Sequence, residues 1–286
     1  MQIGGGRWSM MPPVVKNLLI INGLMYLATV TFQASMGINL YDYLGLHYFQ
    51  SELFSPFQFV SYMFMHGDIS HLFFNMFAVW MFGNAIENAW GSKRFLIYYI
   101  LTGFGAAFLH YLTIYMDIAP VIDELGRIAS DPTANSITEF VASINANELP
   151  NPSQMRGLGT ELQHFNTEVL PALTQDSNNS TLLGEAGNFV ELYKQKFMNM
   201  PNVVGASGSL FGILLAFGMM FPNVRLFFIF LPIPIKAKYF VIGYGLMEFV
   251  SAFQASDNVA HFAHLGGMLF GFIILKIWER SGVRWR

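Results

Sequence analysis

The sequence predicts an all-α membrane protein, a bundle of six transmembrane helices with a long extracytoplasmic insertion between the third and the fourth helix. Of the 286 residues, 53% are hydrophobic and only 12% are charged, and the mean hydropathy is +0.42. This composition is typical of proteins that cross the bilayer several times. The apolar residues also gather in six segments, and a segment of roughly 20 such residues crosses a bilayer as a helix. We expect these helices at residues 14–32, 68–89, 95–116, 203–221, 239–253 and 259–278.

The stretches between these helices divide the chain into five regions. Residues 33–67 are aromatic-rich and broken by Gly and Pro, so we interpret them as a loop at the membrane interface. Residues 225–235 are apolar, but about 11 residues are too few to cross the bilayer. Because Pro232 and Pro234 also interrupt a helix, we expect a second interfacial loop there. The five regions are a cytoplasmic tail (1–13), helices 1–3 with the first loop (14–116), the insertion (117–200), helices 4–6 (201–280) and a basic cytoplasmic tail (281–286).

The insertion, residues 117–200, is acidic and polar. It contains 11 of the 18 acidic residues of the chain and four basic ones. We expect short amphipathic helices around residues 137–144 and 158–173, separated by Pro150, Pro152 and a polar run. Large apolar residues are too sparse to predict an independent core, so we expect the insertion to pack against the membrane domain.

The basic residues give the orientation. Eleven of the 15 lie on the side of the two termini, which the positive-inside rule makes cytoplasmic. We assume a bacterial inner membrane. Because there is no cysteine and no basic run, disulfides, thiolate metal sites and nucleic-acid binding are excluded. The eleven are Arg7, Lys16, Lys93, Arg94, Arg225, Lys236, Lys238, Lys276, Arg280, Arg284 and Arg286.

A serine between small residues opens the fourth helix. Ser207 lies between Gly205 and Gly208, and small residues let a backbone or a substrate approach its hydroxyl closely. Gly208 and Gly212 also form a small-xxx-small pair, so this stretch alone is more typical of helix packing than of a catalytic site. A second such pair, Gly267 and Gly271, lies in the sixth helix.

Other polar groups are predicted at the same membrane depth. A serine needs a base to become a nucleophile, and imidazole titrates in the right range, so His264 is the candidate base. The backbone N–H of Ser207 and the side chains of His71 and Asn75, an i,i+4 pair, are candidate donors to an oxyanion. No carboxylate of the sixth helix is placed to orient His264, whereas Phe211 is placed to stack on it, which predicts a dyad rather than a triad.

These residues resemble the rhomboid family of intramembrane serine proteases, over roughly residues 14–116 and 201–280. The resemblance implies cleavage of a substrate's transmembrane helix near its extracytoplasmic end, with no cofactor, so the expected partners are transmembrane proteins and the lipid bilayer. Two features depart from the family: residues 33–67 lack its Trp-Arg pair, and the insertion is unlike compact members. The motifs are Gly205-x-Ser207-Gly208, Ala263-His264-Leu-Gly-Gly267-x-x-x-Gly271, His71-x-x-x-Asn75 with His66 upstream, and Gly83-x-x-x-Glu87-x-x-x-Gly91.

A different class of function remains open. A transporter or a metal-handling membrane protein would use histidines as ligands, here His66, His71, His261 and His264. The chain lacks a His-Glu-x-x-His motif, a cysteine and an internal repeat, which argues against this alternative. An inactive family member that acts by binding is disfavoured by the intact serine and histidine.

Four further polar residues accompany these groups. His66 is interpreted as a loop anchor and His261 as a loop-facing or structural residue. Glu87 is interpreted as a structural hydrogen-bond acceptor, while Glu248 has no assigned role. Either carboxylate is an alternative proton-relay group.

Overall fold

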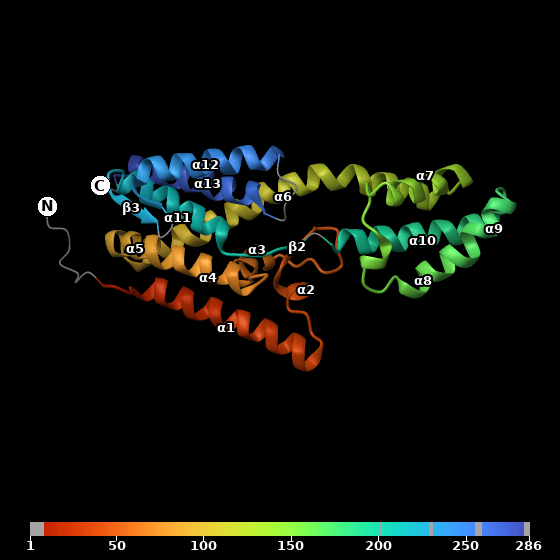
Figure 1. Cartoon of the computed structure of the whole chain (residues 1–286), viewed down its shortest axis with the longest axis horizontal. Helices are drawn as coiled ribbons and strands as arrows, with labels where there is room; N and C mark the ends of the chain where they lie inside the picture. The colour runs from red at the N-terminus through yellow and green to blue at the C-terminus, as the bar shows by residue number, and fades with distance from the viewer. Residues whose placement is uncertain (1–8, 201, 229–230, 255–258, 283–286) are drawn as a thin grey trace. The chain divides into compact units, whose positions relative to one another are not determined.

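A computed structural model describes residues 9–200, 202–228, 231–254 and 259–282 (Figure 1). Helices make up 76% of it, as an all-α protein requires. The chain forms two compact units. The first comprises Met1–Leu46, Ser55–Thr113 and Val203–Arg286, and the second comprises His47–Phe54 and Ile114–Asn202. Most of the predicted N-terminal tail, residues 1–8, and residues 283–286 of the C-terminal tail lie outside the described residues.

The first unit is built from long apolar helices. Within the residues that the structure describes, four helical stretches are long and apolar enough to cross a membrane: Pro13–Met36, Ile69–Trp90, Ser92–Ser130 and His261–Arg280. The first unit contains α1 (Pro13–Met36), α2 (Tyr41–Leu44), α3 (Gln58–Ser61), η1 (Tyr62–Phe64), α4 (Ile69–Ala78), η2 (Val79–Gly83), α5 (Asn84–Trp90), the first part of α6 (Ser92–Ser130), α11 (Ser207–Met220), β3 (Arg225–Phe228), β4 (Leu231–Lys236), α12 (Ala237–Gln254) and α13 (His261–Arg280). The predicted helix at 203–221 thus begins four residues later, at Ser207, because residues 202–203 form the short strand β2 (Asn202–Val203).

Large apolar side chains cover the outside of these helices. Leu24 on α1 is 60% exposed, Phe74 on α4 is 67% exposed and Phe253 on α12 is 68% exposed. Soluble proteins rarely expose so many large apolar residues, whereas lipid is a favourable solvent for them. The exposed faces therefore support a multi-pass protein of the bilayer.

Glycines let α11 approach its neighbours at backbone distance. A Cβ at Gly212 would lie 2.7 Å from Thr102 on α6, and a Cβ at Gly208 would lie 2.4 Å from the Ala106 side chain. A Cβ at Gly267 on α13 would lie only 1.9 Å from the carbonyl oxygen of Gly208. Close backbone contact through small residues is how membrane helices associate. The predicted small-xxx-small positions therefore hold α6, α11 and α13 together.

The start of α1 is capped by a carboxylate from another helix. Glu87 on α5 accepts hydrogen bonds from the backbone N–H groups of Val14 (2.9 Å) and Val15 (2.8 Å) and from the hydroxyl of Ser92 (2.6 Å). The first N–H groups of a helix have no intrahelical partner, and a negative charge there is favourable. Glu87 thus acts as the structural acceptor that its sequence motif predicts.

The segment predicted as a second interfacial loop, residues 225–235, is instead an antiparallel hairpin. Strands β3 and β4 pair Arg225 with Lys236 and Leu226 with Ile235. The segment is not helical, as its prolines predict, and Pro232 and Pro234 are two positions apart, so both missing N–H groups fall on one side of β4. The opposite side of the strand remains able to pair.

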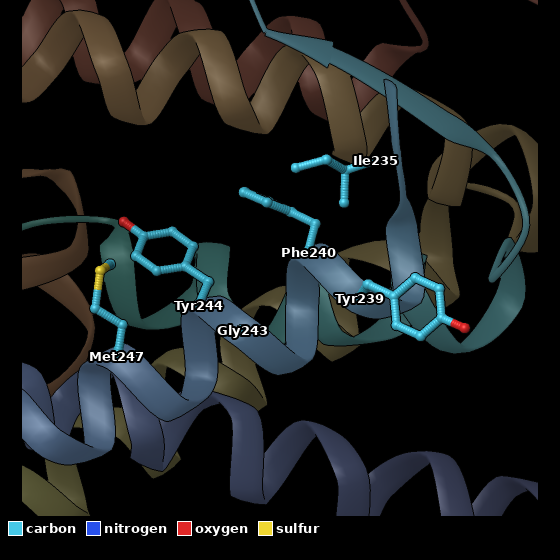
Figure 2. Close-up of a pocket in the computed structure, with 6 residues that line it drawn as sticks. All are labelled: Ile235, Tyr239, Phe240, Gly243, Tyr244 and Met247. Carbon is cyan, nitrogen blue, oxygen red and sulfur yellow. The ribbon is translucent and has the colours of Figure 1, made fainter. Parts of the chain in front are cut away.

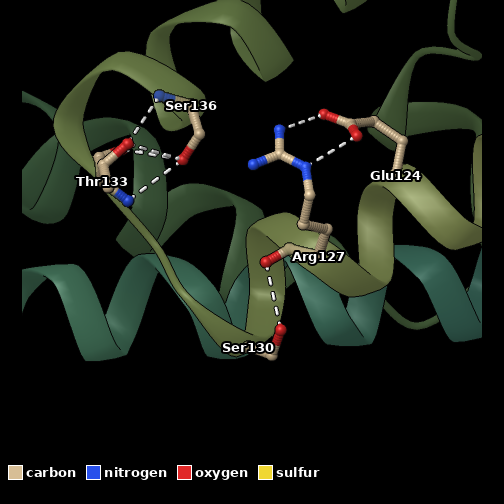
Figure 3. Close-up of polar contacts among 5 residues, drawn as sticks. All are labelled: Glu124, Arg127, Ser130, Thr133 and Ser136. Atoms are coloured by element: carbon tan, nitrogen blue, oxygen red, sulfur yellow. Dashed lines mark hydrogen bonds and ion pairs between the residues drawn. The ribbon is translucent and has the colours of Figure 1, made fainter.

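The helix predicted to end near Met116 continues to Ser130. Apolar residues of α6 recur at helical spacing beyond Met116, and Ile122, Leu125 and Ile128 are buried in the second unit. Their burial outweighs the one backbone hydrogen bond lost at Pro120. After α6, the next helix, α7 (Ala134–Asn145), begins at a capping box of Thr133 and Ser136, while Arg127 and Glu124 form an ion pair of 2.6 Å (Figure 3).

The second unit has its own hydrophobic core, contrary to the prediction that apolar residues are too sparse. Phe165 and Phe189 stack with ring centroids 4.2 Å apart, and Tyr193 packs edge-on against Phe140. Because each amphipathic helix places its apolar face inward, apolar residues that are sparse along the sequence come together in one core. The remaining elements are β1 (Leu46–His47), η3 (Pro152–Gln154), α8 (Gly159–His164), η4 (Phe165–Val169), α9 (Leu170–Gln175) and α10 (Ser180–Met198), so the helix expected at 158–173 is formed by α8, η4 and α9 in succession.

A short polar cluster joins the two parts of the second unit. Glu52 accepts a hydrogen bond of 2.9 Å from the side chain of Asn199, and Lys196 lies 3.4 Å from the same carboxylate oxygen. Ser51 donates to the side-chain oxygen of Asn199 at 2.5 Å. The hydrogen bond from Asn199 and then the charge of Lys196 lower the pKa of Glu52.

Candidate active site

Ser207 is the first residue of α11. The loop before it is fixed by a hydrogen bond of 2.9 Å from the Gly205 N–H to the Tyr62 carbonyl. The first intrahelical bond runs from the Leu210 N–H to the Ala206 carbonyl at 3.0 Å. The N–H groups of the first turn, including that of Ser207, therefore have no intrahelical acceptor and lie at the positive end of the helix dipole. Such a turn is suited to hold a developing negative charge.

Gly205 brings His71 beside this serine. Its φ of +124° is a conformation that L side chains rarely adopt, and a Cβ here would lie 2.9 Å from Nε2 of His71 and 3.8 Å from Oγ of Ser207. The Gly67 N–H donates to Nδ1 of His71 at 3.4 Å. Because Nδ1 accepts, Nε2 carries the proton, so His71 presents an N–H donor on the side of Gly205 and Ser207.

Asn75 lies one turn further along α4 than His71. Asp68 caps this helix by accepting from the His71 backbone N–H at 2.8 Å. The Asn75 side chain is buried, and it forms no hydrogen bond within the described residues. The amide of Asn75 is thus available on the helical face that it shares with His71.

The candidate base is held by a stacked aromatic ring, as predicted. His264 on α13 is buried, and its ring lies 4.1 Å from that of Phe211 with an angle of 12° between the planes. Phe211 is one turn after Ser207 on α11. The contact between Gly208 and Gly267 is one residue from Ser207 and three from His264, so the same helix contact positions the candidate nucleophile and the candidate base.

Serine and base do not form a hydrogen bond in this structure, as judged from the described part of the chain. Catalytic hydrogen bonds are often long without substrate and tighten when it binds. The nearby Ser209 differs, because its buried hydroxyl donates to the Tyr99 carbonyl at 2.8 Å and is fully engaged in helix packing. Ser207 is therefore the serine of α11 whose hydroxyl is available for chemistry.

One residue of this site was missed by the sequence analysis. Glu248 on α12 reaches His264, and its Oε2 lies 2.8 Å from Nδ1 of His264 and 2.6 Å from Nδ1 of His261. The expectation that no carboxylate orients the base considered only the helix of His264 itself. A buried acidic residue in an apolar segment was the available signal, but sequence alone does not give the rotation of one helix against another.

His66 is buried beside His71. It is 1% exposed, its ring lies 5.0 Å from that of His71 in an edge-on arrangement, and its carbonyl accepts from the Tyr41 hydroxyl at 2.6 Å. Neither ring nitrogen has a hydrogen-bond partner among the described residues. His66 therefore supports the position of the His71 ring and the loop before α4.

The four histidines proposed as metal ligands do not form one cluster. In the described chain, the group of donors that could hold an ion is Glu248, His261 and His264. Ligand atoms around a tetrahedral zinc ion with bonds of about 2.0–2.1 Å lie about 3.3 Å apart. The Nδ1 atoms of both histidines are closer than that to Oε2 of Glu248. The spacing is that of hydrogen bonds, so the metal-handling alternative is not favoured.

An open apolar groove of about 410 Å³ follows α12. Figure 2 shows Phe240, Tyr244 and Met247 following one another along this helix. The ring of Tyr244 lies 4.9 Å from that of Phe211, which holds the candidate base. The groove therefore adjoins the α11 face that contains the site. Its lining is Ile235, Tyr239, Phe240, Gly243, Tyr244 and Met247.

A comparison with protein-family models identifies the family. The model described as the Rhomboid domain matches residues 54–119 and 180–280, more than half of the chain. The matched ranges include Ser207, His264, His71 and Asn75. A comparison with curated proteins finds no match. Members of the rhomboid family are intramembrane serine proteases, and the apolar helices agree with such a protein. The chain therefore belongs to the rhomboid family of integral, multi-pass intramembrane proteases.

Proposed function

We propose that this chain is a serine endopeptidase that cleaves transmembrane segments of membrane proteins near the extracytoplasmic face, with Ser207 as nucleophile and His264 as base. The observation that carries the proposal is the contact of α11 and α13 at Gly208 and Gly267. It joins the helix that begins with the serine to the helix that contains the imidazole stacked on Phe211.

The chemistry needs side chains and backbone alone. Nε2 of His264 takes the proton of the Ser207 hydroxyl while Oγ attacks the carbonyl carbon of the peptide bond. The Ser207 N–H, the Nε2–H of His71 and the amide of Asn75 donate to the resulting oxyanion. His264 then gives its proton to the leaving amine, and an acyl-serine remains. A water that loses its proton to His264 attacks this ester, which releases the carboxylate and returns the proton to Ser207.

The short length of α11 supports cleavage inside the membrane. Its 14 residues span about 21 Å at 1.5 Å per residue, against a hydrocarbon core of about 30 Å. If the far end of α11 reaches the cytoplasmic boundary, Ser207 lies about 9 Å below the opposite one. We include α11 and α12 with the four longer stretches as the six spans, with both termini in the cytoplasm of a bacterium and residues 117–200 as an extracytoplasmic insertion.

Labelling with a serine-directed fluorophosphonate tests this function. We expect the purified full-length protein to be labelled and to cleave a transmembrane substrate, and we expect Ser207→Ala to lose both. Ser209→Ala is the matched control, because Ser209 is on the same helix and its acceptor, the Tyr99 carbonyl, keeps a hydrogen bond from Thr102 (3.1 Å). Labelling that persists in Ser207→Ala, or that is lost in Ser209→Ala with the fold intact, would contradict the assignment.

A further inference from the structure

Glu248 is an acidic residue turned into an apolar bundle. It is 4% exposed, whereas Met247 and Phe249 on either side of it are each 54% exposed. A buried carboxylate is costly unless it is paired and hydrogen-bonded. The bundle therefore retains this group against a free-energy cost, and its partners indicate its role.

The partners of Glu248 are the two histidines at the start of α13. Its Oε2 lies 2.6 Å from Nδ1 of His261 and 2.8 Å from Nδ1 of His264. An ionised carboxylate only accepts hydrogen bonds, so both Nδ1 atoms must carry a proton. In the neutral imidazole of His264, the unprotonated nitrogen is then Nε2, the atom that must accept the proton of Ser207.

We propose that Glu248 is the positioning residue of the catalytic base, fixing the tautomer of His264 and which edge of its ring faces the carboxylate. This inference rests on the proposed function. Stacking on Phe211, with ring centroids 4.1 Å apart, holds the plane of the ring but is equally compatible with a 180° flip of the ring about its Cβ–Cγ bond. A hydrogen bond at Nδ1 removes that remaining freedom. The two contacts are complementary: Ser207 and His264 carry out the chemistry as a dyad, while Glu248 and Phe211 hold the base in place.

Glu248 is the group placed to balance a positive charge on His264. When Ser207 gives up its proton, His264 becomes an imidazolium and needs a nearby anion. The titratable groups that face it or its carboxylate from the packed helices are His71 on α4, His110 on α6, Tyr244 on α12 and His261 on α13. By their ordinary pKa values, none of these four described groups is an anion near neutral pH, which leaves the carboxylate of Glu248 as the counter-charge.

The test compares Glu248→Gln and Glu248→Asp with the unchanged full-length enzyme and with His261→Gln as matched control. Glu248→Gln should lower kcat and the rate of fluorophosphonate labelling by at least about tenfold with KM unchanged, since removing the carboxylate of a serine-protease triad costs up to about 10⁴-fold. Glu248→Asp should restore part of the loss because it keeps the charge. His261→Gln removes the other imidazole from the same carboxylate and should change kcat less than about threefold.

A spectroscopic measurement separates positioning from folding. In protein labelled with 15N-histidine, the His264 signals should be those of the Nδ1–H tautomer and should change to mixed tautomers in Glu248→Gln. A Glu248→Gln enzyme that keeps more than about a tenth of the original kcat, an unchanged His264 tautomer, or equal losses in Glu248→Gln and His261→Gln would overturn the inference. Failure of the proposed function is distinct, because then the unchanged protein itself neither cleaves substrate nor labels at Ser207, and the inference falls with it.

Discussion

The contact between Gly208 and Gly267 allows a quantitative prediction for Gly267→Ala. The added Cβ would lie 1.9 Å from the carbonyl oxygen of Gly208, and real Cβ atoms essentially never approach closer than 3.0 Å, so the two helices must separate by about 1.1 Å. The added Cβ is fixed to the backbone of α13 and the oxygen belongs to the backbone of α11, so neither atom can rotate away. Misplacing catalytic groups by about 1 Å costs roughly 100-fold in rate, and overpacking costs about 1–3 kcal/mol of stability. We therefore expect kcat to fall by about two orders of magnitude.

The assay measures kcat and KM on a transmembrane substrate together with thermal unfolding in detergent. Gly23→Ala is the matched control, because Gly23 is on α1 and a Cβ there would have no neighbour within 4 Å. It should leave kcat unchanged. A Gly267→Ala enzyme that remains folded and keeps kcat within about threefold of the unchanged enzyme would refute the view that this contact sets the distance between Ser207 and His264.

Four further outcomes are expected. Asn75→Ala should raise the barrier by up to about 2.7–4 kcal/mol if it removes an oxyanion donor, and undiminished turnover would exclude Asn75 from the site. In sealed right-side-out vesicles, added protease should leave tags at both termini intact and should cleave a tag near Asn178. Termini on opposite faces of the membrane would contradict six spans. Because the pKa of Glu52 is lowered on folding, Glu52→Gln should slightly destabilise the second unit above about pH 4.3. The difference in stability between the two proteins should vanish as pH falls through the lowered pKa, and a difference that persists at low pH would refute this. Replacing residues 120–196 by a flexible linker should retain labelling but alter the preference between substrates with acidic and basic juxtamembrane segments, since the acidic insertion repels acidic ones; unaltered preference would contradict this.

Sequence reasoning reached the parts of the fold that depend on local pattern. Apolar segments gave the long helices, and the pair of Phe211 and His264 followed from helical spacing and came out stacked. The continuation of α6 past Met116 and the core of the second unit depend on which residues meet in space. A proline and an acidic composition argued locally against both, and tertiary burial outweighed them.

The same distinction separates the candidate site residues. Ser207, His264, His71 and Asn75 were selected because costly polar groups recur at similar depth in apolar segments. Glu248 has the same property, but its partner is on a different helix. The rotation of α12 about its axis decides whether the carboxylate faces lipid or the imidazole. The spacing of residues along the sequence does not predict that rotation.

The carboxylate at the start of α1 has a consequence for biosynthesis. Val14 and Val15 are separated from Glu87 by 73 and 72 residues, so the first helix is synthesised well before the residue that caps its start. Until the next span arrives, those two amides must bond to interfacial water. Because a helix cap contributes about 0.5–2 kcal/mol, this late contact favours docking of the first helix against the second. The contact forms only when the second helix crosses the bilayer in the direction that places Glu87 at the start of the first.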